Sequence, residues 1–379
     1  MMKAVINGVI VTPTGILEDH VLLFADGKIT DFAKDVPEDA EVIDAKGLVV
    51  APGFVDVHIH GSGGADVMDG TPEAIATIAA EIAKYGTTSF LPTTLTMGRD
   101  DVYKSLEVVR ELKGKSLPGA EVLGAHLEGP FINPKFKGAQ NESFVVAPDY
   151  DWIADFNDVI KLVTYAPEMD NDFIFTKTVK ANTDVTLSIG HSDASYDLAS
   201  AAIACGCSHI THLFNAMTGL HHRDPGVVGA ALTHDVFTEL IADEIHVNQK
   251  LFQFVLDNKG NDRLVLITDS MRAGCMKDGT YEIGGQRATV EKGAARLSDG
   301  TLAGSVLTLN KAVYNLHRNT NADLVTAIHL ASLNPATSIK VANRKGSLEI
   351  GKDADIIFLD EQFDCHLTIV NGVVVYQNT

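Results

Sequence analysis

The middle of this chain alternates between short apolar runs and amphipathic stretches, and this alternation restricts the fold more than any other feature. Ile75, Ile78 and Ile82 recur every three or four residues in one such stretch, which predicts a helix with one apolar face. Pro72 suits its first turn and Gly86 its end. Strands that alternate with helices pair in parallel. The eight apolar runs are FVDVHIH, TSFLPTT, EVLGAHLEG, IKLVTYAPE, TLSIGH, HITHLFN, TELIADEIH and RLVLITDS. They predict an α/β fold with a closed, TIM-like (β/α)8 barrel.

An open, doubly wound sheet is the alternative for the same alternation. Such a sheet usually carries a glycine-rich nucleotide-binding turn after its first strand. The GSGG stretch at residues 61–64 follows a histidine pair and lacks that spacing. We interpret it as a loop whose backbone approaches a ligand.

The two ends of the chain differ from its middle. Both read as short strands separated by turns such as TPTG, ADGK and VNG. Neither end looks able to bury a core alone. We therefore expect residues 1–51 and 345–379 to pair into one small β-domain, with residues 52–344 as the inserted barrel domain.

The composition excludes some classes of partner. The formal net charge is −20, from 30 basic and 50 acidic residues, and no basic block is present, so we expect no binding to nucleic acids or anionic membranes. The four scattered cysteines do not suggest a disulfide framework. No signal peptide or bilayer-spanning stretch is evident in the sequence. These features predict a cytoplasmic protein.

Potential metal ligands lie toward the ends of five of the eight apolar runs. They are His58 and His60 in the first run, Glu128 in the third, His191 in the fifth, His212 in the sixth and Asp269 in the eighth. A single histidine at a strand end is more often structural, and a single carboxylate is often a helix cap. Because barrel strands end at one mouth, however, these groups would be crowded together and costly to bury without a cation. Imidazole and carboxylate ligands suit zinc or iron.

The number of ligands indicates two divalent ions. The first-run histidines and Asp269 could hold one, and His191 and His212 the other, with Glu128 as a bridge. Two ions about 3.5–4 Å apart would lower the pKa of a shared water towards ~7 and make it a nucleophile. Asp269 could then take the proton and pass it to a leaving group.

The chain resembles the amidohydrolase superfamily and, within it, the N-acetylglucosamine-6-phosphate deacetylase family, over nearly its whole length. The resemblance rests on PGFVDVHIHG, HLEGPFINPKFKGAQ, IGHSDA, THLFNAM, HHRDPG, LIADEIHV, ITDSM and GTLAGS. Many superfamily members use a carboxylated lysine as the bridge, whereas LEGP provides Glu128, as this deacetylase family does. The resemblance implies a distorted barrel with a β-sandwich built from both termini. It also implies a core metal on Glu128, His191 and His212, with Asp269 as general base and acid. The retained His58 and His60 are similar to the family's two-metal branch.

The resemblance further implies a set of substrate contacts: Ala139, Gln140, Asn215, Ala216, Arg223, His246, Leu302, Ala303 and Gly304. Arg223 and His246 match phosphate binders, and the family's arginine can come from a neighbouring subunit, which implies a homodimer. Gln140 stands where some members have a histidine that polarises the acetyl carbonyl; its amide can donate a hydrogen bond but cannot become a cation.

Several of these residues also have plain structural interpretations. Arg223 could equally pair with Asp224 in its loop. We interpret His126 and His209 as structural, and the adjacent His221 and His222 as solvated.

The reaction that the resemblance implies is hydrolysis of N-acetyl-D-glucosamine 6-phosphate to D-glucosamine 6-phosphate and acetate, in amino-sugar catabolism and recycling. Three alternatives stay open: the same reaction on the galactosamine isomer, another amidohydrolase reaction such as base deamination, and a non-catalytic barrel.

Overall fold

Eight parallel strands form the barrel of the computed structural model, which describes residues 1–378. They are β8 (Phe54–Ile59), β11 (Thr87–Thr94), β13 (Ala125–Glu128), β14 (Ile160–Tyr165), β15 (Thr186–Ile189), β16 (His209–Ile210), β17 (Phe237–Ile241) and β18 (Leu264–Ile267). Each of the eight predicted runs contains or overlaps one of these strands. A parallel bridge between Ile59 and Ser270 joins the first strand to the last, so the barrel is nearly closed.

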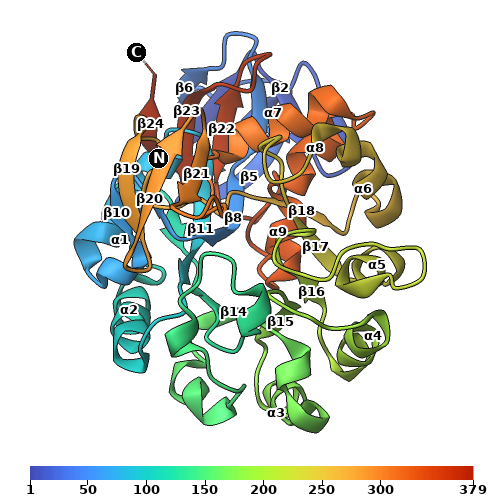
Figure 1. Cartoon of the computed structure of the whole chain (residues 1–379). Coiled ribbons are helices and arrows are strands. Elements are labelled where there is room, and N and C mark those ends of the chain that lie inside the picture. The colour runs from blue at the N-terminus through green and yellow to red at the C-terminus, as the bar shows by residue number, and fades with distance from the viewer. Residues whose placement is uncertain (379) are drawn as a thin grey trace.

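Helices surround these strands (Figure 1). They are α1 (Pro72–Ala83), α2 (Arg99–Leu112), α3 (Ile174–Asn182), α4 (Tyr196–Cys205), α5 (Gly226–Thr233), α6 (Phe252–Lys259), α7 (Leu309–Asn319), α8 (Leu324–Leu330) and α9 (Leu333–Ser338). The predicted helix is confirmed as α1, in which Ile75, Ile78 and Ile82 are buried and the Thr71 side chain caps the first turn. No helix within residues 1–378 has the length and apolar character needed to cross a membrane.

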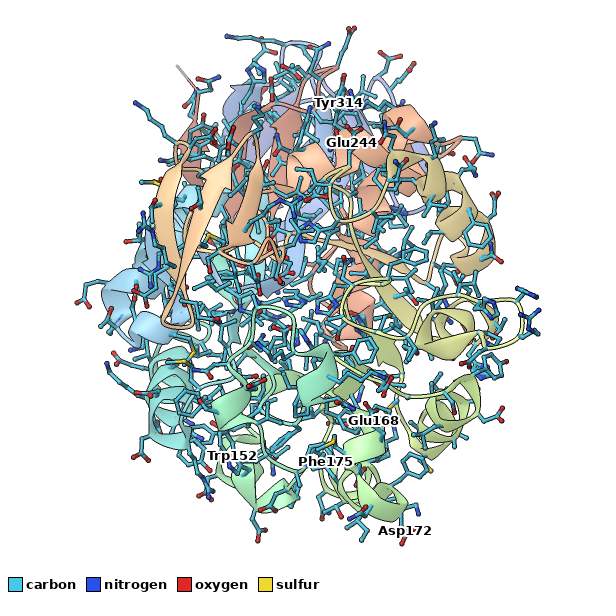
Figure 2. The ribbon with its side chains drawn as sticks, viewed as in Figure 1. Trp152, Glu168, Asp172, Phe175, Glu244 and Tyr314 are labelled. Atoms are coloured by element: carbon cyan, nitrogen blue, oxygen red, sulfur yellow. The ribbon has the colours of Figure 1, made fainter. Side chains whose placement is uncertain are left out.

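The alternation of strands and helices fails at one place. Between β13 and β14, residues 129–159 form only short 3-10 turns within otherwise irregular chain. Aromatic packing covers the barrel there: the Phe131 ring centroid lies 5.8 Å from that of Trp152 and 5.2 Å from that of Phe175. Figure 2 labels Trp152 and Phe175, which lie close together at the lower end of the view. This irregular segment also carries residues that line the barrel mouth.

The two ends of the chain form a β-sandwich, as expected. One sheet has the order β5-β4-β1-β6 and the other β24-β23-β22-β7-β2-β3. Val5 and Leu22 from the first sheet share a buried core with Ile10 and Ile356 from the second. The strands are β1 (Lys3–Ile6), β2 (Val9–Thr12), β3 (Gly15–Leu17), β4 (Val21–Ala25), β5 (Lys28–Ala33), β6 (Glu41–Asp44), β7 (Val49–Pro52), β22 (Ile356–Leu359), β23 (Cys365–Val370) and β24 (Val373–Gln377). We propose the domain boundaries expected above, with β7 reaching one residue beyond the first of them, at Pro52.

A further antiparallel sheet, which the sequence analysis did not predict, follows β18. It consists of β19 (Gly279–Ile283), β20 (Gln286–Glu291) and β21 (Ala294–Leu297). Ile283 and Val290 of this sheet pack in a small apolar cluster with Leu95 and Met271. The sheet thereby becomes one wall of the barrel mouth. The remaining short strands are β9 (Gly61–Ser62), β10 (Ala65–Asp66) and β12 (Glu121–Val122).

Candidate active site

The structure brings the six predicted ligands together at the carboxyl ends of the barrel strands. His58 lies in β8, Glu128 ends β13, and the other four follow their strands by one or two residues. Two groups have ligand atoms within 4.8 Å of one another: His58, His60 and Glu128, and Glu128, His191 and His212. Glu128 belongs to both groups, which is the arrangement expected of a bridging ligand.

Three of these residues leave their strands with a left-handed backbone. The φ angles are 50° at His191, 29° at His212 and 48° at Asp269. Non-glycine residues seldom adopt this region, which costs about 1–2 kcal/mol per residue. Such strain persists where the surrounding structure imposes it, and it concentrates at functional sites.

The group around His191 and His212 is the more compact. Their Nε2 atoms lie 3.1 Å apart, and each lies 3.2 Å from Glu128 Oε1. A tetrahedral ion with bonds of about 2.0–2.1 Å would need ligand atoms roughly 3.3 Å apart. These three atoms therefore approximate one face of a tetrahedral site.

The other group has Asp269 on its open side. His60 Nε2 lies 3.3 Å from Glu128 Oε2 and 3.2 Å from Asp269 Oδ1. His58 Nε2 lies 3.3 Å from Glu128 Oε1 and 3.6 Å from Asp269 Oδ1. Each of these two imidazoles thus faces one oxygen of Glu128 and one of Asp269.

Hydrogen bonds select the histidine tautomer that can bind metal. The Nδ1 atom of His60 lies 3.2 Å from the Thr93 carbonyl oxygen, and that of His191 lies 2.9 Å from the Phe136 carbonyl oxygen. Because a carbonyl only accepts, Nδ1 donates and the Nε2 lone pair is left free. His58 Nδ1 likewise faces a carboxylate at 3.0 Å, and its buried Nε2 has no hydrogen-bond partner within residues 1–378. The donor set therefore fits a divalent cation.

Electrostatics in the site also favour a cation. Burial alone would lower the pKa of His60, but hydrogen bonds to Asp269 and Glu128 outweigh it and raise that pKa to about 9. Burial would raise the pKa of Glu128, yet the charges of His58 and His191 hold it well below its usual value. The carboxylates thus stabilise positive charge in the mouth, which a divalent metal supplies.

A cavity of about 290 Å³ opens beside these ligands. Seven predicted substrate residues line it: Ala139, Gln140, Asn215, Ala216, His246, Leu302 and Gly304. Ala303 is fully buried in the apolar cluster behind the cavity. Arg223 does not line the cavity; it is exposed, and its Nη1 lies 2.7 Å from His222 Nε2.

Two of the lining residues are held by protein contacts. Gln140 Nε2 donates to Glu128 Oε2 at 2.6 Å, and Gln140 Oε1 accepts from the Thr96 backbone N–H at 2.7 Å. The amide that we expected to face the substrate therefore faces Glu128. His246 Nδ1 lies 2.7 Å from Asp243 Oδ2.

The interpretation of His126 and His209 as structural agrees with their contacts. His126 Nε2 lies 2.8 Å from Thr164 Oγ1, and His209 Nδ1 lies 3.1 Å from Ser188 Oγ. Burial lowers the pKa of both, so both are neutral at neutral pH.

Sequence reasoning missed three polar residues around the site. Glu239 of β17 is fully buried and accepts hydrogen bonds from His58 and His212. Asp56 lies below His58 on the same strand face, and burial raises its pKa to about 7. Lys135 lines the cavity mouth. The available signal for Glu239 and Asp56 was a charged residue inside an apolar run, which requires a buried partner.

Comparisons with known proteins show which family the chain is similar to. The amidohydrolase family profile matches residues 49–375. The chain is 40% identical over 378 residues to N-acetylglucosamine-6-phosphate deacetylase of Bacillus subtilis (strain 168), covering 97% of this chain and 95% of that one. It is 36% identical over 356 residues to N-acetylgalactosamine-6-phosphate deacetylase of Escherichia coli O157:H7, with 93% of each covered. The crystal structure of N-acetylglucosamine-6-phosphate deacetylase from Pasteurella multocida superimposes with a TM-score of 0.94 at 31% identity, covering 100% of both chains. These matches confirm the resemblance, and this chain belongs to the amidohydrolase family.

Proposed function

We propose that this chain hydrolyses N-acetyl-D-glucosamine 6-phosphate to D-glucosamine 6-phosphate and acetate, in amino-sugar catabolism and recycling. The observation that carries the proposal is the pair of ligand groups that share Glu128, in a chain similar along its length to a deacetylase of this substrate. The barrel alone would not suffice, because this fold hosts many unrelated reactions.

Two divalent ions are assigned to the site. Glu128, His191 and His212 would hold one, and His58 and His60, with Asp269 and Glu128 beside them, would hold the second. Nitrogen and oxygen ligands of this kind suit zinc or iron. When bound, such an ion supplies Lewis acidity and lowers the pKa of water beside it.

Asp269 is assigned to proton transfer. Burial would raise its pKa, but the adjacent His58 and His60 lower it, so Asp269 is a carboxylate at neutral pH and can accept a proton. Water adds to the acetyl carbon, and Asp269 takes its proton. Asp269 then gives that proton to the amide nitrogen as the C–N bond breaks, which releases the amine and acetic acid, and the acid ionises to acetate at neutral pH.

His246 and Arg223 are assigned to the phosphate. Burial alone would lower the pKa of His246, but the hydrogen bond with Asp243 raises it above its usual value, which favours a cation at the cavity wall. Arg223 stands outside the cavity of its own chain, so we propose a homodimer in which each chain gives this residue to its partner's site. The remaining cavity-lining residues are assigned to the sugar and acetamide: Ala139, Gln140, Asn215, Ala216, Leu302 and Gly304. Ala303 is fully buried behind the cavity and is assigned to the support of this wall.

The galactosamine isomer is the second candidate substrate. The similarity to the Escherichia coli galactosamine enzyme favours it, although with lower identity than the glucosamine relative. The two sugars differ in the orientation of one hydroxyl group, so a difference in kcat/KM separates them.

Acetate release tests the proposal. Protein of known metal content is incubated in parallel with N-acetylglucosamine 6-phosphate, the unphosphorylated sugar and the galactosamine isomer. We expect the first to react fastest, with activity that a chelator removes and added metal restores. A metal-loaded protein that releases acetate from none of them would contradict the proposed function.

A further inference from the structure

Glu239 joins the two ligand groups from below. It lies in β17 with no exposed surface. Its Oε2 atom lies 3.0 Å from His58 Nδ1, in the first group, and 3.0 Å from the His212 backbone nitrogen, in the second. One carboxylate oxygen therefore contacts residues from two different strands and both groups.

The contact with His58 determines which ring nitrogen is free. A carboxylate accepts hydrogen bonds, so the proton must lie on Nδ1 and the lone pair on Nε2. The neighbouring Glu128 and Asp269 act in the opposite direction, because both face Nε2 and would favour a proton there. Glu239 is thus the group that favours the tautomer with a free Nε2, which is the one that can bind metal.

The contact with His212 holds a strained turn. His212 has a φ angle of 29°, and its backbone N–H donates to the Glu239 side chain. The following N–H, that of Leu213, donates to the Glu239 carbonyl oxygen at 2.9 Å. Glu239 therefore holds the backbone that directs His212 Nε2 toward His191, 3.1 Å away.

We propose that Glu239 is a positioning residue shared by both metal sites, which fixes the tautomer of His58 and the backbone of His212. Carboxylates that hold metal-binding histidines are known to change metal affinity by 10–100-fold. The inference rests on the metal assignment made under the proposed function. What it adds is that one residue, which binds no metal itself, sets the affinity of both sites.

Cobalt titration of the metal-free protein tests this role. Co²⁺ is added in competition with a chelator, and its visible absorption reports binding at each site. The variants are Glu239→Leu, which removes the acceptor, and Glu239→Gln, whose amide oxygen can still accept from both donors. Asp170→Asn is the matched control, because Asp170 is also buried and accepts hydrogen bonds from Phe175 and Thr176 outside the site.

We expect two bound ions in the unsubstituted protein. Glu239→Leu should raise the dissociation constants of both sites, that of the His58 site by about 10–100-fold. Both constants should change by no more than about a few-fold in Glu239→Gln. In Asp170→Asn they should equal those of the unsubstituted chain. If Glu239→Leu does not fold, Glu239→Thr replaces it, since the shorter hydroxyl side chain cannot reach both donors.

Three results would overturn the inference. The first is that Glu239→Leu leaves both cobalt dissociation constants unchanged. The second is that Asp170→Asn raises them as much as Glu239→Leu does. The third is that Glu239→Gln binds cobalt as weakly as Glu239→Leu, which would assign the effect to the charge of Glu239. Absence of bound cobalt from the unsubstituted chain would overturn the metal assignment as well, so the two failures are distinguishable.

Discussion

Substitution of Lys345 by methionine tests how the sandwich is joined to the barrel. Lys345 Nζ lies 2.7 Å from Glu121 Oε2, 2.9 Å from Asp353 Oδ2 and 2.7 Å from Asp355 Oδ2, and its side chain is 0% exposed. Arg344 also pairs with Glu121 and Asp353, so those two carboxylates keep a cation in the variant. Within residues 1–378, Asp355 has no other cationic partner.

The expected loss follows from the charge that is left at Asp355. Removing one partner of a buried pair costs about 3–5 kcal/mol, because the other charge stays buried without compensation. An unfolding entropy of about 2.1 cal/mol/K per residue over 379 residues converts this loss into a fall in Tm of about 4–6 °C. Circular dichroism during heating at pH 7, with metal content held equal, measures it.

The loss of folding stability in Lys345→Met should be smaller at acidic pH. Burial already raises the pKa of Asp355 even with Lys345 beside it, and removal of the ammonium raises that pKa further. The folded variant then binds a proton more readily than the unfolded chain. Its stability relative to the parent therefore recovers as the pH falls below the folded pKa of Asp355, by up to about 1.4 kcal/mol per pH unit.

A second substitution separates charge from packing. Lys345→Met combined with Asp355→Asn removes both members of the pair, and we expect it to regain most of the lost stability. The reasoning is refuted if the single variant loses less than about 1 kcal/mol, the range of exposed pairs. It is also refuted if the double variant is no more stable than the single one.

Three further changes test the assignments in the site. Asp269→Asn should retain metal, as measured by elemental analysis, yet release acetate about 10²–10⁴-fold more slowly. Full activity would exclude a role for Asp269 in proton transfer. Arg223→Ala should raise KM for the phosphorylated sugar by about 10–100-fold, the worth of a charge-assisted hydrogen bond, and should affect the plain sugar little. At a substrate concentration far below the raised KM, an equimolar hybrid of these two variants should regain roughly a quarter of the parent activity if Arg223 acts across a two-fold interface. If Arg223 acts within its own chain, the hybrid should be no more active than the two variants measured separately. Because Asp243 raises the pKa of His246, KM for the phosphorylated substrate should rise as the pH increases through that pKa, and Asp243→Asn should shift the rise to lower pH.

The barrel could be predicted from the sequence because its signal is local and repeated. Each strand is a short apolar run, and the residues after it fall at one mouth whatever the length of the connecting loop. That rule alone brought His58 and Asp269 together across more than half of the chain, and the structure confirms their proximity. The β19–β21 sheet escaped prediction because it interrupts the alternation.

The contacts that orient the ligands could not be predicted in this way. Glu239 meets His58 across 181 residues of sequence, and no spacing rule specifies which inward-facing carboxylate contacts which imidazole. Gln140 has the chemistry of a donor to the substrate, yet its rotamer directs the amide to Glu128. Such choices depend on packing between elements distant in sequence, which propensity and periodicity do not encode.

At the barrel mouth, departures from the regular strand–helix pattern contribute to the site. The loop that replaces a helix after β13 carries Gln140, and the left-handed residues His191, His212 and Asp269 follow otherwise regular strands. A regular barrel needs none of these departures, and each costs free energy that the buried core must offset. Because a left-handed residue turns the chain sharply at the strand end, the departures point side chains into the mouth and concentrate there the ligands that the proposed metals require. At the ends of these three barrel strands, left-handed backbone and predicted ligands therefore coincide.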